Sequence, residues 1–197
     1  MNTILMISGK QGSGKTTLSD TIKKYAVDYD FDFVSTLKFA DTLYELHEYL
    51  LNKMETLTGK PRIKKDGKLL QILGTEWGRE NFGENVWVDI LKKKIEKLES
   101  QKSKRLIIID DCRFENEFDA FPEALRVRLY CAENVRKLRT DAWRDNTNHP
   151  SEIGLDDYSA KNLFDVTYDT SINEPMNIAG NIFTLLNSNS WKNGRKQ

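Results

Sequence analysis

The sequence lacks the features that would place it in a membrane or outside the cell. No apolar run approaches the roughly 20 residues that are needed to span a bilayer. The first ten residues carry no basic region and no small-residue cleavage site, so we expect no signal peptide. The only two cysteines, Cys112 and Cys131, fit no metal-binding spacing and favour a reducing compartment. We therefore expect a cytoplasmic protein without a membrane partner.

The chain also lacks an excess of charge of either sign. Its 30 Lys and Arg residues balance 30 Asp and Glu residues, which gives a formal net charge of +0. This balance argues against a protein whose main task is to bind duplex DNA, and we expect no stable nucleic-acid complex. A length of 197 residues with 39% hydrophobic and 30% charged residues is typical of one folded domain, spanning residues 1–197.

Short apolar segments alternate with helical patterns along the chain. The patterns predict strands at residues 3–7, 31–34, 106–109, 125–130 and 164–168. They predict helices at residues 16–25, 39–51, 69–79, 86–98, 134–144 and 175–186. The alternation indicates an α/β fold with a five-stranded parallel sheet covered by helices on both faces. Mostly helical stretches at residues 36–100 and 132–160 are expected to be lobes inserted into this single domain. Because residues 125–130 alternate Leu or Val with Arg, that strand is predicted to be half-exposed.

A phosphate-binding loop stands between the first predicted strand and the first predicted helix. Residues 9–16, GKQGSGKT, match G-x-x-x-x-G-K-[ST] at every fixed position. Backbone N–H groups of such a loop point at phosphate oxygens, and the helix N-terminus adds positive charge. Lys15 is expected to reach the β- and γ-phosphates, and the Thr16 hydroxyl to ligate Mg²⁺. The predicted ATP-binding residues of this segment are Gly9, Gln11, Gly12, Ser13, Gly14, Lys15, Thr16 and Thr17.

Two acids follow the most apolar predicted strand. Asp110 and Asp111 come directly after residues 106–109, and an acid there holds Mg²⁺ directly or through water in phosphate-loop proteins. The sequence leaves open which of the two serves the metal. Arg113 is expected to point toward the same mouth of the sheet, where open α/β folds bind ligands.

A phosphate loop alone does not specify the acceptor of the phosphoryl group. The guanine-reading motif N-K-x-D is absent, which argues against a GTPase switch, and motor or AAA ATPases usually need a longer chain. At this size a small-molecule kinase that uses ATP and Mg²⁺ fits best.

Four further segments resemble the motifs of bacteriophage-type deoxynucleoside monophosphate kinases. They are F-A-D at residues 39–41, LQILGTEWGR at 70–79 followed by Trp87, DCRFENE at 111–117, and HPSE at 149–152. The resemblance implies an adenylate-kinase-like core with a substrate lobe and a lid. It also implies transfer of a phosphoryl group from ATP to a deoxynucleoside monophosphate, which yields ADP and the deoxynucleoside diphosphate.

Kinase chemistry brings two anionic substrates together, so the site needs cations, and the planar arginine fork suits phosphate best. We expect Arg79 to bind the acceptor's phosphate and Arg113 to lie between the two phosphates. Arg136, Arg139 and Arg144 on the predicted lid helix are expected to cover the ATP phosphates. The predicted catalytic residues are Lys15, Arg79, Arg113 and Arg139. The predicted acceptor-binding residues are Lys38, Phe39, Asp41, Gln71, Glu76, Trp77, Arg79, Trp87, Arg113, His149 and Glu152. For Trp87 and His47, which lie on apolar helical stripes, core packing is the favoured alternative.

Several alternatives stay open at this point. One is a phosphate-loop kinase that modifies a hydroxymethylated pyrimidine within phage DNA, for which the basic segment 60–68 would supply contacts. Others are a kinase of another small phosphorylated acceptor, such as phosphomevalonate, and a non-catalytic nucleotide-binding switch. The many apolar helical faces would permit a homodimer.

Overall fold

The computed structural model describes residues 2–98, 103–139, 150–188 and 191. The chain divides into two compact units. The first, which we call the sheet unit, comprises Met1–Leu37 and Glu99–Gln197. The second, which we call the helical unit, comprises Lys38–Leu98. The expectation of a single domain with inserted lobes at residues 36–100 and 132–160 stays a prediction.

The sheet unit contains a five-stranded sheet in the order β2-β3-β1-β4-β5, in which every neighbouring pair is parallel. Its strands are β1 (Asn2–Gly9), β2 (Phe33–Leu37), β3 (Arg105–Cys112), β4 (Leu125–Tyr130) and β5 (Val166–Asp169). The predicted α/β fold with a five-stranded parallel sheet is confirmed.

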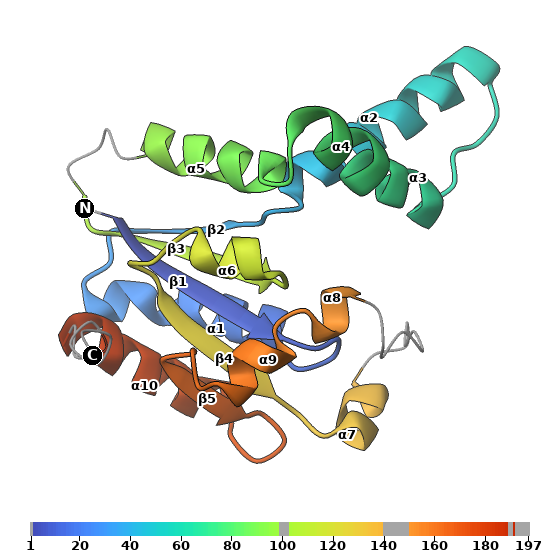
Figure 1. Cartoon of the computed structure of the whole chain (residues 1–197). Helices are drawn as coiled ribbons and strands as arrows, with labels where there is room; N and C mark the ends of the chain where they lie inside the picture. Colours follow the sequence, from blue (N-terminus) through green and yellow to red (C-terminus); the bar gives the residue numbers. More distant parts are fainter. Residues whose placement is uncertain (1, 99–102, 140–149, 189–190, 192–197) are drawn as a thin grey trace. The chain divides into compact units, whose positions relative to one another are not determined.

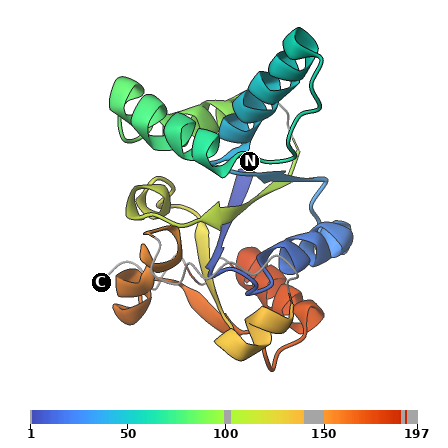
Figure 2. The same ribbon diagram turned by 90° about the vertical axis from the view of Figure 1, so that its right-hand side faces the viewer.

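Helices cover both faces of this sheet (Figure 2). On one face α1 (Lys15–Tyr25) and α10 (Pro175–Ser188) pack on alternate residues of β1, β3 and β4, and Ile22 and Phe183 are buried there. On the other face lie the short helices α6 (Glu115–Asp119) and α9 (Asp156–Ala160). Phe118 of α6 contacts the ring of Tyr158 on α9, at a centroid distance of 5.0 Å. Burial of both faces explains why β1 and β3 are continuous apolar runs.

The connections after β1 and β3 leave the sheet on opposite faces (Figure 1). The segment after β1 leads into α1, and the segment after β3 leads into α6. Where two neighbouring parallel strands diverge in this way, a crevice opens beyond their carboxyl ends, and ligands bind there in open α/β folds. The remaining short elements of this unit are η1 (Ala26–Tyr29), α7 (Glu133–Leu138) and α8 (Pro150–Ile153).

The helical unit consists of α2 (Asp41–Thr58), α3 (Gly67–Gln71), the π-helical segment η2 (Ile72–Trp77), α4 (Gly78–Phe82) and α5 (Val86–Leu98). Gly74 and Gly78 both take part in its packing, and a Cβ on Gly74 would lie 3.1 Å from Leu43 Cδ2. The indole N–H of Trp87 donates to the Gly74 carbonyl at 2.9 Å. A Cβ on Gly78 would lie 2.5 Å from the Leu73 carbonyl oxygen and 2.6 Å from the Trp87 ring. Only glycine therefore fits at position 78, where the chain changes from the π-helical segment to α4.

The structure corrects one strand prediction and refines others. The prediction that residues 125–130 form a half-exposed strand is wrong, because Arg128 is only 8% exposed and bonds to groups around it. The second strand starts at Phe33 instead of residue 31, since Phe31 packs as a buried core residue ahead of the strand. Helix α7 ends at Leu138, and residues 140–144 of the predicted helix lie outside the described residues.

The short helices α6, α8 and α9 were not predicted, because four or five residues are too few for a helical period to show. Within the described part of the chain, none of the helices combines the length and the apolar character that crossing a membrane requires.

Candidate active site

The loop between β1 and α1 depends on two glycines in the left-handed backbone region. Gly12 has φ 75° and Gly14 has φ 88°, values that residues with a Cβ adopt only with strain. A Cβ on Gly12 would also lie 2.9 Å from the Arg136 carbonyl oxygen. The Ser13 N–H closes the turn by donating to the Lys10 carbonyl at 3.2 Å, and α1 starts at Lys15. Gly14 is a fixed glycine of the motif, and at Gly9, the other fixed glycine, a Cβ would lie 2.8 Å from the Leu129 carbonyl oxygen.

Lys15 folds back over the loop. Its Nζ donates to the Gly9 carbonyl at 2.6 Å and to the Lys10 carbonyl at 3.0 Å. Desolvation, together with the Arg113 charge, lowers the pKa of Lys15 from 10.5 to about 8, although Glu152 and Asp110 oppose this shift. These groups therefore act on one another electrostatically. Thr16 and Thr17 follow at the exposed start of α1.

The two acids after β3 lie in different surroundings. Leu106 and Ile108 of the same strand contribute to the core beneath α1 and α10. Asp110 is buried and acts on Lys15, whereas the Asp111 carboxylate helps to raise the pKa of Cys112. This placement favours Asp110 over Asp111 beside the phosphate loop.

A Mg²⁺ ion that arrives with a nucleotide takes one or two protein oxygens and fills the other positions with phosphate and water. Thr16 and Asp110 offer such oxygens, a hydroxyl and a carboxylate, and they fit the ion. No group of three or more His, Cys, Asp or Glu side chains suited to a metal gathers among residues 2–98, 103–139 and 150–188. A metal at Thr16 and Asp110 would therefore obtain most of its ligands from the nucleotide and from water.

Two carboxylates hold Arg113, one through its side chain and the other through its backbone N–H. Its Nη1 donates to Glu152 Oε1 at 2.9 Å. Glu117 Oε2 accepts from the backbone N–H of Arg113 at 2.7 Å and from that of Phe114 at 3.1 Å. Glu117 thus satisfies N–H groups at the start of α6 and fixes the backbone that carries Arg113. Sequence analysis gave Glu117 no role, although it belongs to the DCRFENE segment.

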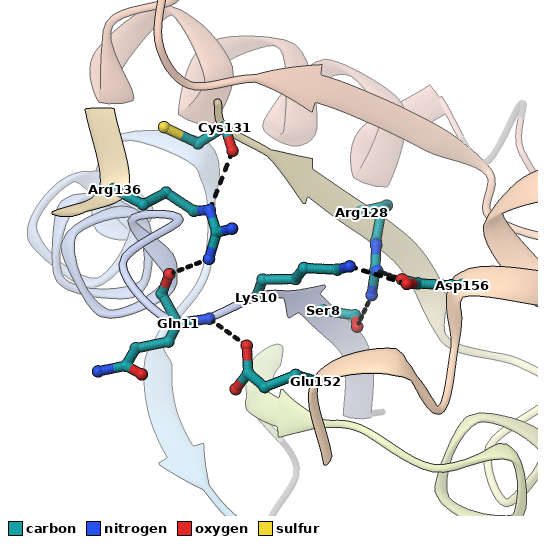
Figure 3. A network of polar contacts seen from close by, with 8 residues as sticks. All are labelled: Ser8, Lys10, Gln11, Arg128, Cys131, Arg136, Glu152 and Asp156. Atoms are coloured by element: carbon teal, nitrogen blue, oxygen red, sulfur yellow. Dashed lines mark hydrogen bonds and ion pairs between the residues drawn. The ribbon is translucent and has the colours of Figure 1, made fainter. Parts of the chain in front are cut away.

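Two carboxylates from the segment after position 149 contact the phosphate loop (Figure 3). Glu152 Oε2 accepts from the Gln11 N–H at 2.8 Å, and Asp156 Oδ2 accepts from Lys10 Nζ at 2.8 Å. The other oxygen of Asp156 accepts from Arg128 Nη2 at 2.8 Å. These contacts join α8 and α9 to the second and third residues of the loop.

Arg128 contacts the end of β1 directly before the loop, and Arg136 contacts the loop itself (Figure 3). Arg128 Nη1 donates to Ser8 Oγ at 2.9 Å, and desolvation lowers the pKa of Arg128. Arg136 donates from Nε to the Cys131 carbonyl at 3.1 Å and from Nη1 to the Gln11 carbonyl at 2.9 Å. Arg136 is buried, and this placement favours a role in positioning the loop over a role above the ATP phosphates.

Sequence analysis did not assign functions to Lys10, Arg128 or Asp156. Arg128 and its partner Ser8 are 120 residues apart in the sequence, and Lys10 and its partner Asp156 are 146 residues apart. The one available signal was the arginine at position 128 within an apolar strand, since a buried arginine must be paired.

A cavity of about 640 Å³ adjoins the phosphate loop, a size typical of small-molecule sites. It is lined by residues 12–18, Arg139, residues 170–175 and Ile178. Arg139 donates to Thr170 Oγ1 at 3.0 Å and to the Thr170 carbonyl at 2.7 Å, and Thr170 Oγ1 donates to the Ser13 carbonyl at 3.0 Å. Arg139 therefore shares one cavity with the loop. Arg144 and His149 lie outside the described residues.

In the helical unit, several predicted acceptor-binding residues have packing or turn roles. Asp41 Oδ2 accepts from the Lys38 N–H at 2.8 Å, which fixes the turn into α2. Phe39 is buried, and burial of Trp87 favours core packing over stacking on a substrate. His47 is buried as well, and its Nε2 accepts from the Asp66 N–H at 3.0 Å, as expected of a packing histidine.

The remaining candidates of the helical unit are accessible. Gln71, Glu76 and Trp77 are exposed, and Arg79 is half-buried. The Trp77 ring meets the edge of Phe82 at a centroid distance of 5.1 Å. The three exposed side chains are therefore accessible to a ligand, and the assignment of all four residues to the acceptor stays a prediction.

Comparisons with known proteins agree with these observations. No protein-family model matches the chain. A search of curated proteins finds the deoxynucleoside-5'-monophosphate kinase of Escherichia phage T5, 29% identical over 144 residues, which cover 67% of this chain and 51% of that protein. The chain thus spans about half the length of the curated relative it matches.

Solved structures show the same fold. A protein of Thermus thermophilus, TT1252, superposes with a TM-score of 0.60 at 11% identity, covering 96% of this chain and 98% of that chain. The APS kinase of Mycobacterium tuberculosis, solved with AMPPNP and APS, gives a TM-score of 0.52 at 11% identity, covering 94% and 98%. At 11% identity these matches show a shared fold and nothing about function. The match to the T5 protein confirms the resemblance of this chain to bacteriophage-type deoxynucleoside monophosphate kinases.

Proposed function

We propose that the protein is a phosphotransferase that uses ATP to convert deoxynucleoside monophosphates into diphosphates. One observation carries the proposal: a complete phosphate loop whose Lys15 interacts with Arg113 and Asp110 at the carboxyl ends of β1 and β3. The match to the T5 kinase supports the choice of a deoxynucleoside monophosphate as acceptor. Since that relative is a phage protein, the proposed setting is the cytoplasm of an infected host.

In the proposed reaction, a phosphate oxygen of the acceptor attacks the γ-phosphorus of ATP. The bond from that phosphorus to the bridging oxygen of ADP breaks, and ADP leaves with the electron pair. Direct transfer of this kind needs no covalent enzyme intermediate, so the protein acts by positioning and charge neutralisation. Lys15 leaves the carbonyls of Gly9 and Lys10 to contact the phosphates, and Arg113 neutralises charge on the transferred group.

The cofactors of the proposal are ATP and Mg²⁺. Thr16 and Asp110 would hold Mg²⁺, which neutralises phosphate charge when bound. The cavity of about 640 Å³ beside residues 170–175 would take the nucleoside of ATP, with Arg139 at its wall. Gln71, Glu76, Trp77 and Arg79 of the helical unit would bind the acceptor.

The proposal is tested by ADP release with ATP and Mg²⁺ over a panel of acceptors. The panel holds the deoxynucleoside monophosphates (5-hydroxymethyl pyrimidines included), the matching ribonucleotides, and DNA with or without hydroxymethyluracil. Turnover with free deoxynucleoside monophosphates supports the proposal. Turnover with modified DNA alone would show that the same residues serve a DNA-modifying kinase. If no acceptor of the panel is phosphorylated, the proposed acceptor is refuted.

A pair of variants tests the acceptor site separately. Arg79→Met is expected to lower turnover at least about 100-fold, because one arginine on a phosphate contributes several kcal/mol in the transition state. ATP affinity should stay as in the wild type. Arg62→Met is the matched control, since Arg62 lies in the same unit and pairs with Glu48. Equal activity of both variants would contradict the assignment of Arg79.

A further inference from the structure

Glu152 presents a buried carboxylate to groups that are suited to phosphate. Its side chain is only 4% exposed. One carboxylate oxygen accepts from the backbone N–H of Gln11 at 2.8 Å, and the other accepts from Arg113 Nη1 at 2.9 Å. The Glu152 charge also raises the pKa of Lys15 against the effect of desolvation. A loop N–H and an arginine thus bind one anion, whose charge also acts on the loop lysine.

These partners are the ones that a nucleotide phosphate requires. The N–H groups of a phosphate loop bind phosphate oxygens, and its lysine reaches the β- and γ-phosphates. An arginine fork binds carboxylate and phosphate oxygens in the same geometry. A carboxylate and a phosphate cannot both occupy this place, since two anions in contact repel strongly away from bulk water.

We propose that Glu152 occupies a phosphate position in the nucleotide-free protein and that a nucleotide phosphate displaces it on binding. This inference rests on the proposed function and deepens it, because it makes the release of α8 part of ATP binding. Glu152 is then an internal competitor of the nucleotide. Its departure frees the Gln11 N–H and Arg113 for the incoming phosphate.

The neighbouring contacts limit the movement to a short segment. Asp156 holds α9 through Arg128 and Lys10, and neither contact involves the Gln11 N–H. Leu155, directly before α9, is buried. Helix α8 itself is closed by the Gly154 N–H, which donates to the Pro150 carbonyl at 2.8 Å. Gly154 packs closely on the backbone, where an added Cβ would lie 2.7 Å from the Arg113 carbonyl oxygen. Residues 150–153 can therefore leave the loop while Gly154 and α9 stay in place.

The first test measures anion binding by calorimetry, without any acceptor, using pyrophosphate and Mg²⁺-ATP as probes. Glu152→Gln keeps the shape of the side chain and removes its charge. It should bind both probes about tenfold more tightly than the wild type, because a charge-assisted contact no longer competes. Asp157→Asn is the matched control: it removes the same charge from an exposed position on α9 and should change affinity less than about twofold. Equal or weaker binding by Glu152→Gln would overturn the proposal.

The second test uses the wild-type protein and hydrogen exchange. Saturating pyrophosphate should speed exchange at the Gly154 amide, since release of Glu152 loosens α8, and should slow exchange in residues 11–16. An unchanged or slower Gly154 amide would overturn the displacement. Neither test needs turnover. If affinity and amide exchange change as expected but no acceptor is phosphorylated, the proposed kinase activity is refuted and the role of Glu152 stands. If an acceptor is phosphorylated but affinity and exchange do not change, the role of Glu152 is refuted and the kinase activity stands.

Discussion

Binding of ATP should draw a proton onto Lys15. In the free protein, desolvation and Arg113 lower the pKa of Lys15 to about 8. Phosphates beside the ammonium favour its charged form and return the pKa toward its ordinary value of 10.5. Below pH 8 the lysine is already charged, so affinity is flat there. Above pH 8 each binding event must take up a proton, so affinity falls as the pH rises.

The size of this effect follows from the pKa. At about pH 9 roughly nine-tenths of Lys15 is neutral in the free protein, so binding takes up about 0.9 proton and affinity is about tenfold lower than at about pH 7. Calorimetry in two buffers of different ionisation enthalpy measures the proton uptake directly. Lys15→Arg is the control, because a guanidinium stays charged throughout and its binding should not vary over this range. A wild-type affinity that is constant from about pH 7 to about pH 9.5 would refute the reasoning.

Five further substitutions separate chemistry from packing. Arg113→Met should lower turnover, measured as ADP release, at least about 100-fold, because charge on the transferred group is no longer neutralised. Asp110→Asn should raise the Mg²⁺ concentration needed for half-maximal turnover, and Asp111→Asn should raise it less; equal effects would contradict the preference for Asp110. Trp87→Phe loses the bond to the Gly74 carbonyl and should cost about 1–2 kcal/mol of unfolding free energy in urea. Gly78→Ala should cost about 1–3 kcal/mol, because the added Cβ meets the Leu73 carbonyl oxygen, and an unchanged midpoint would show that the chain relaxes there.

The sheet and the phosphate loop were predictable because their signals are local. Apolar runs of strand length, a helical period and the spacing of Gly9, Gly14 and Lys15 all lie within a few residues of one another. The same approach misjudged residues 125–130. Alternating arginines predict a solvent-facing side, but in the structure α6 and α9 cover that side, and Asp156 and Ser8 pair with Arg128.

The supports of the loop could not be predicted, because their partners are distant in the chain. Lys10 meets Asp156 across 146 positions, and Arg136 meets the Gln11 carbonyl across 125. A basic residue on a predicted helix has the same sequence signature whether it covers a ligand or holds a backbone. For Arg136 only burial and the position of its donors distinguish the two, and they favour holding the loop.

The structure also separates two kinds of residue within the LQILGTEWGR segment and the tryptophan that follows it. Gly74 accepts the Trp87 indole N–H, and Gly78 leaves room for the Trp87 ring, so these three positions serve the packing of the helical unit. Their recurrence in relatives would follow from the fold of this unit, whatever the acceptor. Gln71 and Trp77 of the same segment are exposed, although the Trp77 ring meets the edge of Phe82. Substitutions at Gln71 should therefore change acceptor preference and leave the free energy of unfolding unchanged, whereas substitutions at Gly74, Gly78 and Trp87 should lower the free energy of unfolding first.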